Sequence, residues 1–306
     1  MVAPSGAIPS DLITEPCRRA RLPGLTLLIG LALTVTEATS SGRQFTSGVN
    51  VVEVYTTATD KAGKPVTGLG REAFTVRENG EPQQITTFAA GEFPLSVAVA
   101  IDRSFSMTGD RLASAKSGAR IFLEALRQTD ESMVIAVGST TDTLAPLSTN
   151  RREQLDALAG LDAFGTTGLY DSIVAGIEAI QPARGRRALI LLSDGDDRYS
   201  KTTSAEVLER ARAADVLIYP IALGRARPQA FAELATLTGG RSFHVRDARQ
   251  LPDTLQTIAA ELRNQYLIGY SPTRPPVAGS NEWRSITVTV SRPDVTVRAR
   301  DGYLVK

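Results

Sequence analysis

The feature that most constrains the fold is an apolar run that ends in a cluster of polar side chains. Residues 95–101 are almost wholly apolar, and they lead directly into Asp102, with Ser104 and Ser106 at alternate positions after it. Such a run between polar residues predicts a strand that is buried on both faces of a parallel sheet. Ligands bind just beyond the carboxyl ends of these strands in open α/β sheets. One carboxylate and two hydroxyls are therefore expected at a binding edge, and these hard oxygen donors suit Mg²⁺ rather than zinc or copper.

Strand-like and helical segments alternate from residue 95 to about residue 262. The strand candidates are residues 95–101, 133–138, 188–192, 216–223 and 242–245, with 143–147 as an added edge strand. The helical candidates are residues 111–127, 151–159, 169–180, 204–214, 228–237 and 251–262. This alternation predicts an α/β fold, in which a doubly wound, mostly parallel sheet carries helices on both faces.

The segments on either side of this region are strand-like. In the first arm, residues 45–93, β-branched residues are frequent, and Asn79-Gly80 predicts a hairpin in which residues 85–88 return. The second arm, residues 264–306, has alternating stretches at 266–270, 285–290 and 295–300. Neither arm is long enough to enclose a core alone. We therefore expect the arms to form one β-sandwich with residues 95–262 inserted between them; two separate small units are the alternative.

The first 38 residues have the pattern of a signal peptide. Arginines at positions 18, 19 and 21 precede a short apolar run at 25–35, and Thr36-Glu37-Ala38 places small residues where a signal peptidase cleaves. We expect export, and hence a secreted, periplasmic or cell-envelope protein. The alternative is that the segment stays uncleaved and anchors the protein. Only in that case do we expect contact with a membrane.

Composition excludes several function classes. Lys and Arg number 34 against 33 Asp and Glu, so no basic excess points to nucleic acid. Cys17 and His244 are the only residues of their kinds, which argues against Cys/His zinc sites, disulfide scaffolds and cysteine catalysis. A Ser/His/Asp hydrolase would depend on His244, and no Gly-x-Ser-x-Gly motif is present. Aspartyl-phosphate chemistry would need a carboxylate where Ser104 stands. We therefore expect no enzymatic activity, with a Mg²⁺-dependent hydrolase as the weakest alternative.

Two later segments place oxygen donors in similar positions. Thr166 and Thr167 lie in a loop that leads into the helix predicted at 169–180, and the spacing to that helix favours Thr167. Residues 188–192 form a second apolar run, and Asp194 follows it just as Asp102 follows the first run. These donors converge with Asp102 if the two strands are neighbours.

Each of these residues also has a simpler interpretation. Asp102, Ser104 and Ser106 are residue types that cap helices, so they are alternatively expected to cap the helix that follows. Asp196 and Asp197 fit a turn with a solvated acidic rim. Asp171 is expected to stabilise the start of a helix rather than bind metal. We expect His244 to be a structural residue.

Taken in order, the three motifs resemble those of the von Willebrand factor type A (VWA) domain. The motifs are Asp102-x-Ser104-x-Ser106, the Gly-Thr-Thr-Gly-Leu-Tyr-Asp segment that begins at Gly165, and Leu192-Ser193-Asp194-Gly195. They are similar to the metal-ion-dependent adhesion site (MIDAS) of that domain, and the resemblance covers about residues 95–262. The flanking arms are similar to recurring elements of secreted bacterial VWA-related proteins.

The resemblance implies a site for Mg²⁺, with Mn²⁺ or Ca²⁺ as alternatives. It implies direct ligation by Ser104, Ser106 and Thr167, while Asp102 and Asp194 act largely through ordered waters. It also implies a protein that uses the cation for protein–protein interaction or adhesion, in which a partner supplies an Asp or Glu carboxylate. A metal-independent scaffold of sandwich and α/β domain is the alternative.

The first motif departs from the family pattern at two positions. Arg103 and Phe105 stand where small residues are usual. Neither position is expected to be a ligand, so the site should remain intact. We expect both side chains to lie at the rim of the site, where Arg103 either weakens cation binding or attracts an acidic partner.

Overall fold

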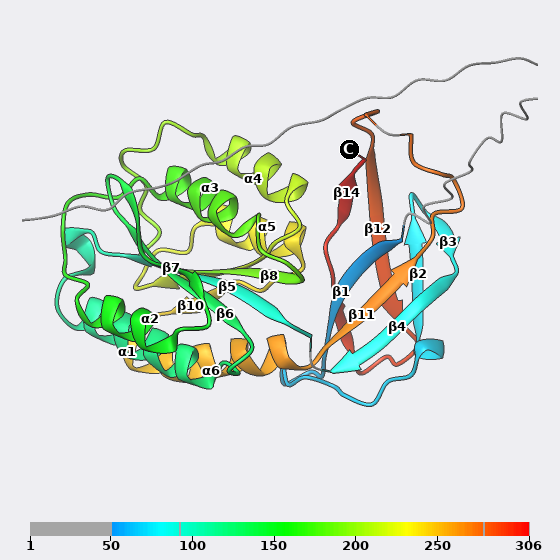
Figure 1. The fold of residues 1–306 in the computed structure, drawn as a ribbon, viewed down its shortest axis with the longest axis horizontal. Coiled ribbons are helices and arrows are strands. Elements are labelled where there is room, and N and C mark those ends of the chain that lie inside the picture. The colour runs from blue at the N-terminus through cyan, green and yellow to red at the C-terminus, as the bar shows by residue number, and fades with distance from the viewer. Residues whose placement is uncertain (1–50, 92, 278, 306) are drawn as a thin grey trace, which may run out of the picture. The chain divides into compact units, whose positions relative to one another are not determined.

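The computed structural model describes residues 51–91, 93–277 and 279–305 (Figure 1). The predicted signal peptide and Cys17 lie outside the described residues. Within that part of the chain, no helix has both the length and the apolar character needed to cross a bilayer.

The α/β region is built on a six-stranded sheet in the order β10-β9-β8-β5-β6-β7. All neighbouring strands are parallel except β6 and β7, which are antiparallel. The strands are β5 (Leu95–Asp102), β6 (Glu131–Val137), β7 (Thr141–Ser148), β8 (Arg186–Ser193), β9 (Leu217–Leu223) and β10 (Phe243–Val245). The predicted doubly wound, mostly parallel sheet is confirmed, including the added edge strand.

Helices cover both faces of this sheet because its central strand is apolar on both faces. Val97, Val99 and Ile101 of β5 belong to one core with side chains of α1, α2 and α6, whereas Ala98 and Ala100 belong to a second core with α3, α4 and α5. The helices are α1 (Asp110–Ala125), α2 (Arg151–Ala159), α3 (Leu169–Ile180), α4 (Ser204–Ala213), α5 (Gln229–Thr238) and α6 (Leu251–Arg263), with short 3₁₀ turns at η1 (Arg71–Ala73), η2 (Phe105–Met107) and η3 (Ala248–Gln250).

Strand β5 lies at the point where the strand order reverses. The chain passes from β5 to β6 on one side and returns to β8 on the other side. The ends of β5 and β8 are in register, with Ile101 opposite Leu192. This is the crevice at which open α/β sheets bind ligands. Asp102 ends β5 and Asp194 directly follows the neighbouring strand β8, as their convergence requires.

The two arms form a β-sandwich, as expected. One four-stranded sheet has the order β13-β1-β11-β4 and the other β14-β12-β2-β3, so each sheet combines strands of both arms. A single buried core joins the sheets, with side chains from β1, β2, β11 and β12. The strands are β1 (Val52–Thr59), β2 (Phe74–Glu78), β3 (Glu81–Gln83), β4 (Ile85–Gly91), β11 (Gln265–Tyr270), β12 (Trp283–Val290), β13 (Thr296–Arg298) and β14 (Gly302–Leu304).

The hairpin at Asn79-Gly80 is present, but the expected return strand was wrong. Asn79 and Gly80 have φ of 50° and 84°, and the next residues, β3, pair at once with β2. A two-residue turn with two positive φ angles places its flanking residues directly opposite each other. Residues 85–88 belong to β4, which pairs with β11 in the other sheet.

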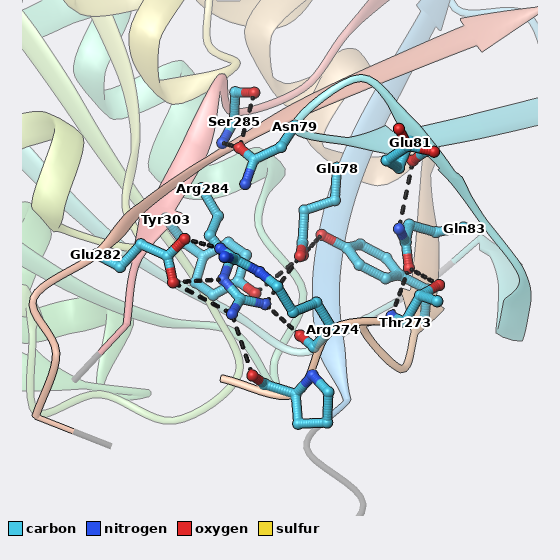
Figure 2. Close-up of polar contacts among 12 residues, drawn as sticks. Glu78, Asn79, Glu81, Gln83, Thr273, Arg274, Glu282, Arg284, Ser285 and Tyr303 are labelled. Carbon is cyan, nitrogen blue, oxygen red and sulfur yellow. Dashed lines mark hydrogen bonds and ion pairs between the residues drawn. The ribbon is translucent and has the colours of Figure 1, made fainter. Parts of the chain in front are cut away.

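A buried polar cluster crosses the sandwich (Figure 2). Glu78 and Arg284 are 4% and 1% exposed, and Arg284 Nη1 donates to Glu78 Oε1 at 3.0 Å. The hydroxyls of Tyr270 and Tyr303 donate to Glu78 Oε2 at 2.8 and 2.9 Å. Burial, together with the Glu78 bond, raises the pKa of Tyr303 to about 12. The cluster joins strands β2, β11, β12 and β14.

Candidate metal centre

Asp102 lies at the carboxyl end of β5 and is fully buried. Its Oδ1 accepts a hydrogen bond from the Ser104 backbone N–H at 2.9 Å, and its Oδ2 accepts one from Ser193 Oγ at 2.7 Å. Burial raises the pKa of Asp102, and the bonds from Ser104 and Ser193 oppose part of that shift. The carboxylate is thus held in one orientation by two neighbours.

The two serines of the first motif face each other. Ser104 is buried, and its Oγ lies 3.0 Å from Ser106 Oγ. The interpretation of these side chains as helix caps was wrong: α1 begins at Asp110 after Gly109, and neither this helix nor η2 receives a side-chain cap bond. The hydroxyls therefore remain as oxygen donors at the end of the strand.

Thr167 belongs to the loop that precedes α3. Its side chain is 3% exposed, and its Oγ1 lies 3.5 Å from Asp102 Oδ1, whereas Thr166 is half-buried. The loop is fixed by backbone hydrogen bonds from Gly168 N–H to the Gly138 carbonyl and from Arg198 N–H to the Thr167 carbonyl, at 2.7 and 3.0 Å. The structure therefore places Thr167, rather than Thr166, beside Asp102.

Asp194 follows β8 and is 8% exposed. Its charge contributes to raising the pKa of Asp102, as expected of two carboxylates at one sheet edge. Gly195 follows with φ of +87°, a backbone conformation that residues with a side chain rarely adopt. The guanidinium of Arg111 lies 3.9 Å from Asp194 Oδ2.

These side chains have the donor chemistry that a hard divalent cation needs. Two carboxylates match its charge, and hydroxyl oxygens add ligands without adding charge. Among the described residues, no group of three or more His, Cys, Asp and Glu side chains gathers into a potential metal cluster. A cation at this edge would therefore depend on the hydroxyls of Ser104, Ser106 and Thr167, which favours Mg²⁺ over zinc.

Sequence reasoning missed two residues that order the site. Ser193 is fully buried; its hydroxyl donates to Asp102 and accepts from the Gly195 N–H at 3.0 Å. Its position directly before Asp194 was the available signal. Asp197 was expected in a solvated rim, which was wrong: its Oδ1 accepts from the Leu169 N–H at 2.8 Å and from Ser200 Oγ at 2.6 Å, so it caps α3.

Other predicted residues have structural partners. Asp171 lies in the first turn of α3, and its carboxylate accepts backbone N–H bonds from Lys201 and Thr202 at 3.0 and 2.9 Å. His244 Nε2 lies 2.9 Å from the Gly224 carbonyl.

The two residues expected at the rim of the site, Phe105 and Arg103, differ in exposure and in contacts. Phe105 is 62% exposed. Arg103 is 21% exposed, forms a 2.7 Å ion pair with Asp142 of β7, and lies over the Phe164 ring at 5.5 Å from its centroid. Arg103 was expected either to weaken cation binding or to attract an acidic partner; the structure shows that its guanidinium pairs with Asp142.

Arg111 leads to a testable prediction. Its guanidinium faces Asp194 and also donates to the Ser106 carbonyl at 2.9 Å, so it adds positive charge to the place where a cation would bind. We expect Arg111→Gln to bind Mg²⁺ about fivefold more tightly, because a positive charge on a half-exposed side chain beside the cation costs ~1 kcal/mol.

Isothermal titration calorimetry measures this difference. Arg120→Gln is the matched control, because Arg120 lies on the same helix and pairs with Glu124. The gain should shrink as salt is added. Equal Mg²⁺ affinity of Arg111→Gln and the wild type at low salt would contradict the prediction.

The fold defines an α/β domain with a cluster of polar side chains at the carboxyl edge of its sheet, and the flanking arms form a β-sandwich. The chain belongs to the von Willebrand factor type A domain family, whose model matches residues 96–257. Domains of this family are in general interaction or adhesion modules rather than enzymes.

Two curated proteins are similar to this chain. Human calcium-activated chloride channel regulator 4 is 28% identical over 224 residues, which cover 68% of this chain and 23% of that protein. Bovine inter-alpha-trypsin inhibitor heavy chain H4 is 26% identical over 198 residues, which cover 58% of this chain and 22% of that protein. The chain thus spans less than a quarter of the length of either relative.

Solved structures show the same fold. A von Willebrand factor type A protein from Catenulispora acidiphila has a TM-score of 0.52 and 14% identity, covering 83% of this chain and 73% of that one. Proximal thread matrix protein 1 from the mussel byssus, in a structure with a zinc-occupied MIDAS motif, has a TM-score of 0.50 and 14% identity, covering 60% and 49%.

Proposed function

We propose that this protein binds a divalent cation, Mg²⁺ in the first place, and uses it to hold another protein. The proposed ligand set is Asp102, Ser104, Ser106, Thr167 and Asp194. The observation that carries the proposal is the convergence of buried Asp102 with Ser104, Thr167 and Asp194 at the end of two neighbouring strands. The zinc-occupied MIDAS motif of the mussel protein supports a cation at this position of the fold.

Each residue has a distinct part in this proposal. The hydroxyls of Ser104, Ser106 and Thr167 offer neutral oxygen ligands, while Asp102 and Asp194 supply negative charge, in part through water. When bound, the cation supplies an electrophilic centre that attracts a carboxylate oxygen. Ser193 and the Ser104 N–H hold the Asp102 carboxylate in place, so that little reorganisation is needed when the cation binds.

The location and domain limits are part of the same proposal. The pattern in residues 1–38 supports export, and the similarity of the arms to recurring elements of secreted bacterial VWA-related proteins supports a protein of that type. We place the VWA domain at residues 95–262, with 45–93 and 264–306 forming the sandwich.

Calorimetric titration of Mg²⁺ into the full chain tests the proposal. We expect one binding event that EDTA abolishes and that Asp194→Asn weakens by at least about tenfold. Asp196→Asn is the matched control, because Asp196 lies in the same loop but is exposed and pairs with Arg198. Failure of the wild type to bind Mg²⁺, Mn²⁺ or Ca²⁺ would overturn the metal site. A partner complex unaffected by EDTA would favour the metal-independent scaffold.

A further inference from the structure

Exposed aromatic side chains gather at the candidate metal centre. Among the described residues, the large apolar side chains that are exposed include three aromatic ones, Phe105, Phe164 and Tyr199, at 62%, 62% and 63% exposure. All three belong to the loops that carry the proposed ligands. Single exposed apolar residues are common, but a group of aromatic side chains around a polar site is typical of an interaction surface.

Backbone hydrogen bonds join the loops that carry these three residues. Phe105 stands between Ser104 and Ser106, and its N–H donates to the Gly165 carbonyl at 3.0 Å. The Phe164 N–H donates to the Arg103 carbonyl at 2.6 Å, and the Tyr199 N–H donates to the Thr167 carbonyl at 3.2 Å. We call Phe105, Phe164 and Tyr199 the aromatic rim; it draws one residue from each of the three loops that form the site.

One ring of the aromatic rim, that of Phe164, is held in advance of any partner. The Arg103 guanidinium lies over the Phe164 ring and is itself held by Asp142, so one face of this ring is already covered. Side chains that are ordered before binding lose less conformational entropy on association. Aromatic residues are also enriched among those that contribute most of the binding energy at protein interfaces.

The charges at the rim and at the centre of the site indicate the chemistry of the partner. Around the rim, Arg103 pairs with Asp142 and Arg198 pairs with Asp196, so these charges cancel. In the centre, the Arg111 guanidinium lies 3.9 Å from Asp194, and the Asp194 charge also acts on the Asp102 carboxyl. A divalent cation therefore makes the centre net positive inside an apolar surround. A complementary partner carries one negative charge surrounded by apolar surface.

We propose that the aromatic rim binds a protein loop that presents one Asp or Glu carboxylate between apolar side chains, and that the rim, not the charge alone, selects the partner. The inference rests on the proposed cation site, which supplies the central contact. It goes further by assigning Phe105, Phe164 and Tyr199 as the residues that choose among carboxylate-bearing partners.

A displayed library of short disulfide-cyclised peptides, each with an invariant central Asp between random residues, tests this inference. The library is selected in Mg²⁺ against the full chain, and enriched peptides are then titrated calorimetrically. We expect enrichment of aromatic and branched apolar residues beside the Asp, and loss of binding when that Asp becomes Asn. The variant carrying Phe105→Ser, Phe164→Ser and Tyr199→Ser should bind at least about tenfold more weakly.

Controls separate this inference from the proposed function. The triple variant should keep the wild-type Mg²⁺ affinity, which shows that its site is intact. Val277→Ser changes a 68% exposed residue between β11 and β12, and this variant should bind the peptides as the wild type does.

Peptides without apolar preference, or an unchanged affinity of the triple variant, would overturn the inference while leaving the cation site intact. Self-association that the triple variant loses would assign the rim to a second copy and also overturn it. Absence of Mg²⁺ binding by the wild type would remove both proposals.

Discussion

Glu78→Ala is expected to lower the free energy of unfolding of the sandwich by about 3–5 kcal/mol, since loss of one partner leaves a buried charge unpaired. Arg284 is 1% exposed and relies on Glu78 for its buried counter-charge. The same substitution removes the acceptor of the Tyr270 and Tyr303 hydroxyls. Each of these donors then lies in the sandwich without its partner, which adds a desolvation cost.

The remaining contacts of Arg284 do not replace Glu78. Its guanidinium donates to the carbonyls of Arg274 and Pro275 at 2.6 and 3.2 Å, and it meets the half-buried Glu282 at 3.3 Å (Figure 2). Glu282 already pairs with Arg274. Carbonyl acceptors stabilise a guanidinium but do not cancel its charge.

Urea unfolding followed by tryptophan fluorescence measures this loss of stability in the sandwich itself. Trp283 is the only tryptophan of the chain and directly precedes Arg284 in β12. Asp294→Ala is the matched control, because its ion pair with Arg292 lies in the same arm but both side chains are about half exposed; it should cost less than about 1 kcal/mol. The double variant with Glu78→Gln and Arg284→Met should recover much of the loss. A cost below about 1 kcal/mol for Glu78→Ala would show that the cluster does not stabilise the sandwich.

Asp102→Asn is expected to abolish Mg²⁺ binding without weakening the cation-free fold. Burial raises the pKa of Asp102 above its value in the unfolded chain, so ionised Asp102 costs stability. That cost is absent below the unfolded pKa, builds as pH rises, and is fully present above the folded pKa. Asn carries no charge, and its side-chain oxygen can still accept the Ser104 N–H bond. The advantage of the variant in the absence of cation should therefore grow from acid to neutral pH.

Thermal unfolding with and without Mg²⁺ separates the two effects. At a cation concentration of about 100 times the dissociation constant, the wild type should gain ~2.7 kcal/mol and Asp102→Asn nothing. Asp156→Asn, an exposed residue of α2, should gain as the wild type does. Equal stabilisation of Asp102→Asn by Mg²⁺ would show that the carboxylate is not needed for the cation.

Local patterns were enough to predict most of the elements. Helices α2 and α3 begin and end at the expected residues, because apolar periodicity and flanking polar residues define them. The hairpin failed for a different reason. Asn79-Gly80 specifies the turn, but which sheet residues 85–88 join depends on the distant strand β11. The short strand β14 was missed because it depends on partners that are distant in sequence. It pairs with β12, and its Tyr303 hydroxyl donates to Glu78 of the buried cluster.

The same difference between local patterns and contacts that are distant in sequence applies to single side chains of the candidate site. Asp102 and Asp194 were predictable because each carboxylate stands at or just beyond the end of an apolar run, which marks the end of a buried strand. Ser193 ends β8 and Asp197 lies in the loop after it, yet their partners, Asp102 and the start of α3, are distant in sequence. Arg103 and Asp142 are likewise brought together only because β5 pairs with β6 and β6 pairs with β7.

By itself, the sequence determined the residue types at each strand end, the alternation that requires a doubly wound sheet, and the family to which the chain belongs. Those properties are local, because apolar periodicity and short motifs carry them. Only the tertiary structure decided that Thr167 rather than Thr166 lies beside Asp102, that Arg103 pairs with Asp142, and that backbone hydrogen bonds join the loops of Phe105, Phe164 and Tyr199. The physical reason is that loops are oriented by backbone hydrogen bonds to other loops, and a single stretch of sequence does not specify such bonds.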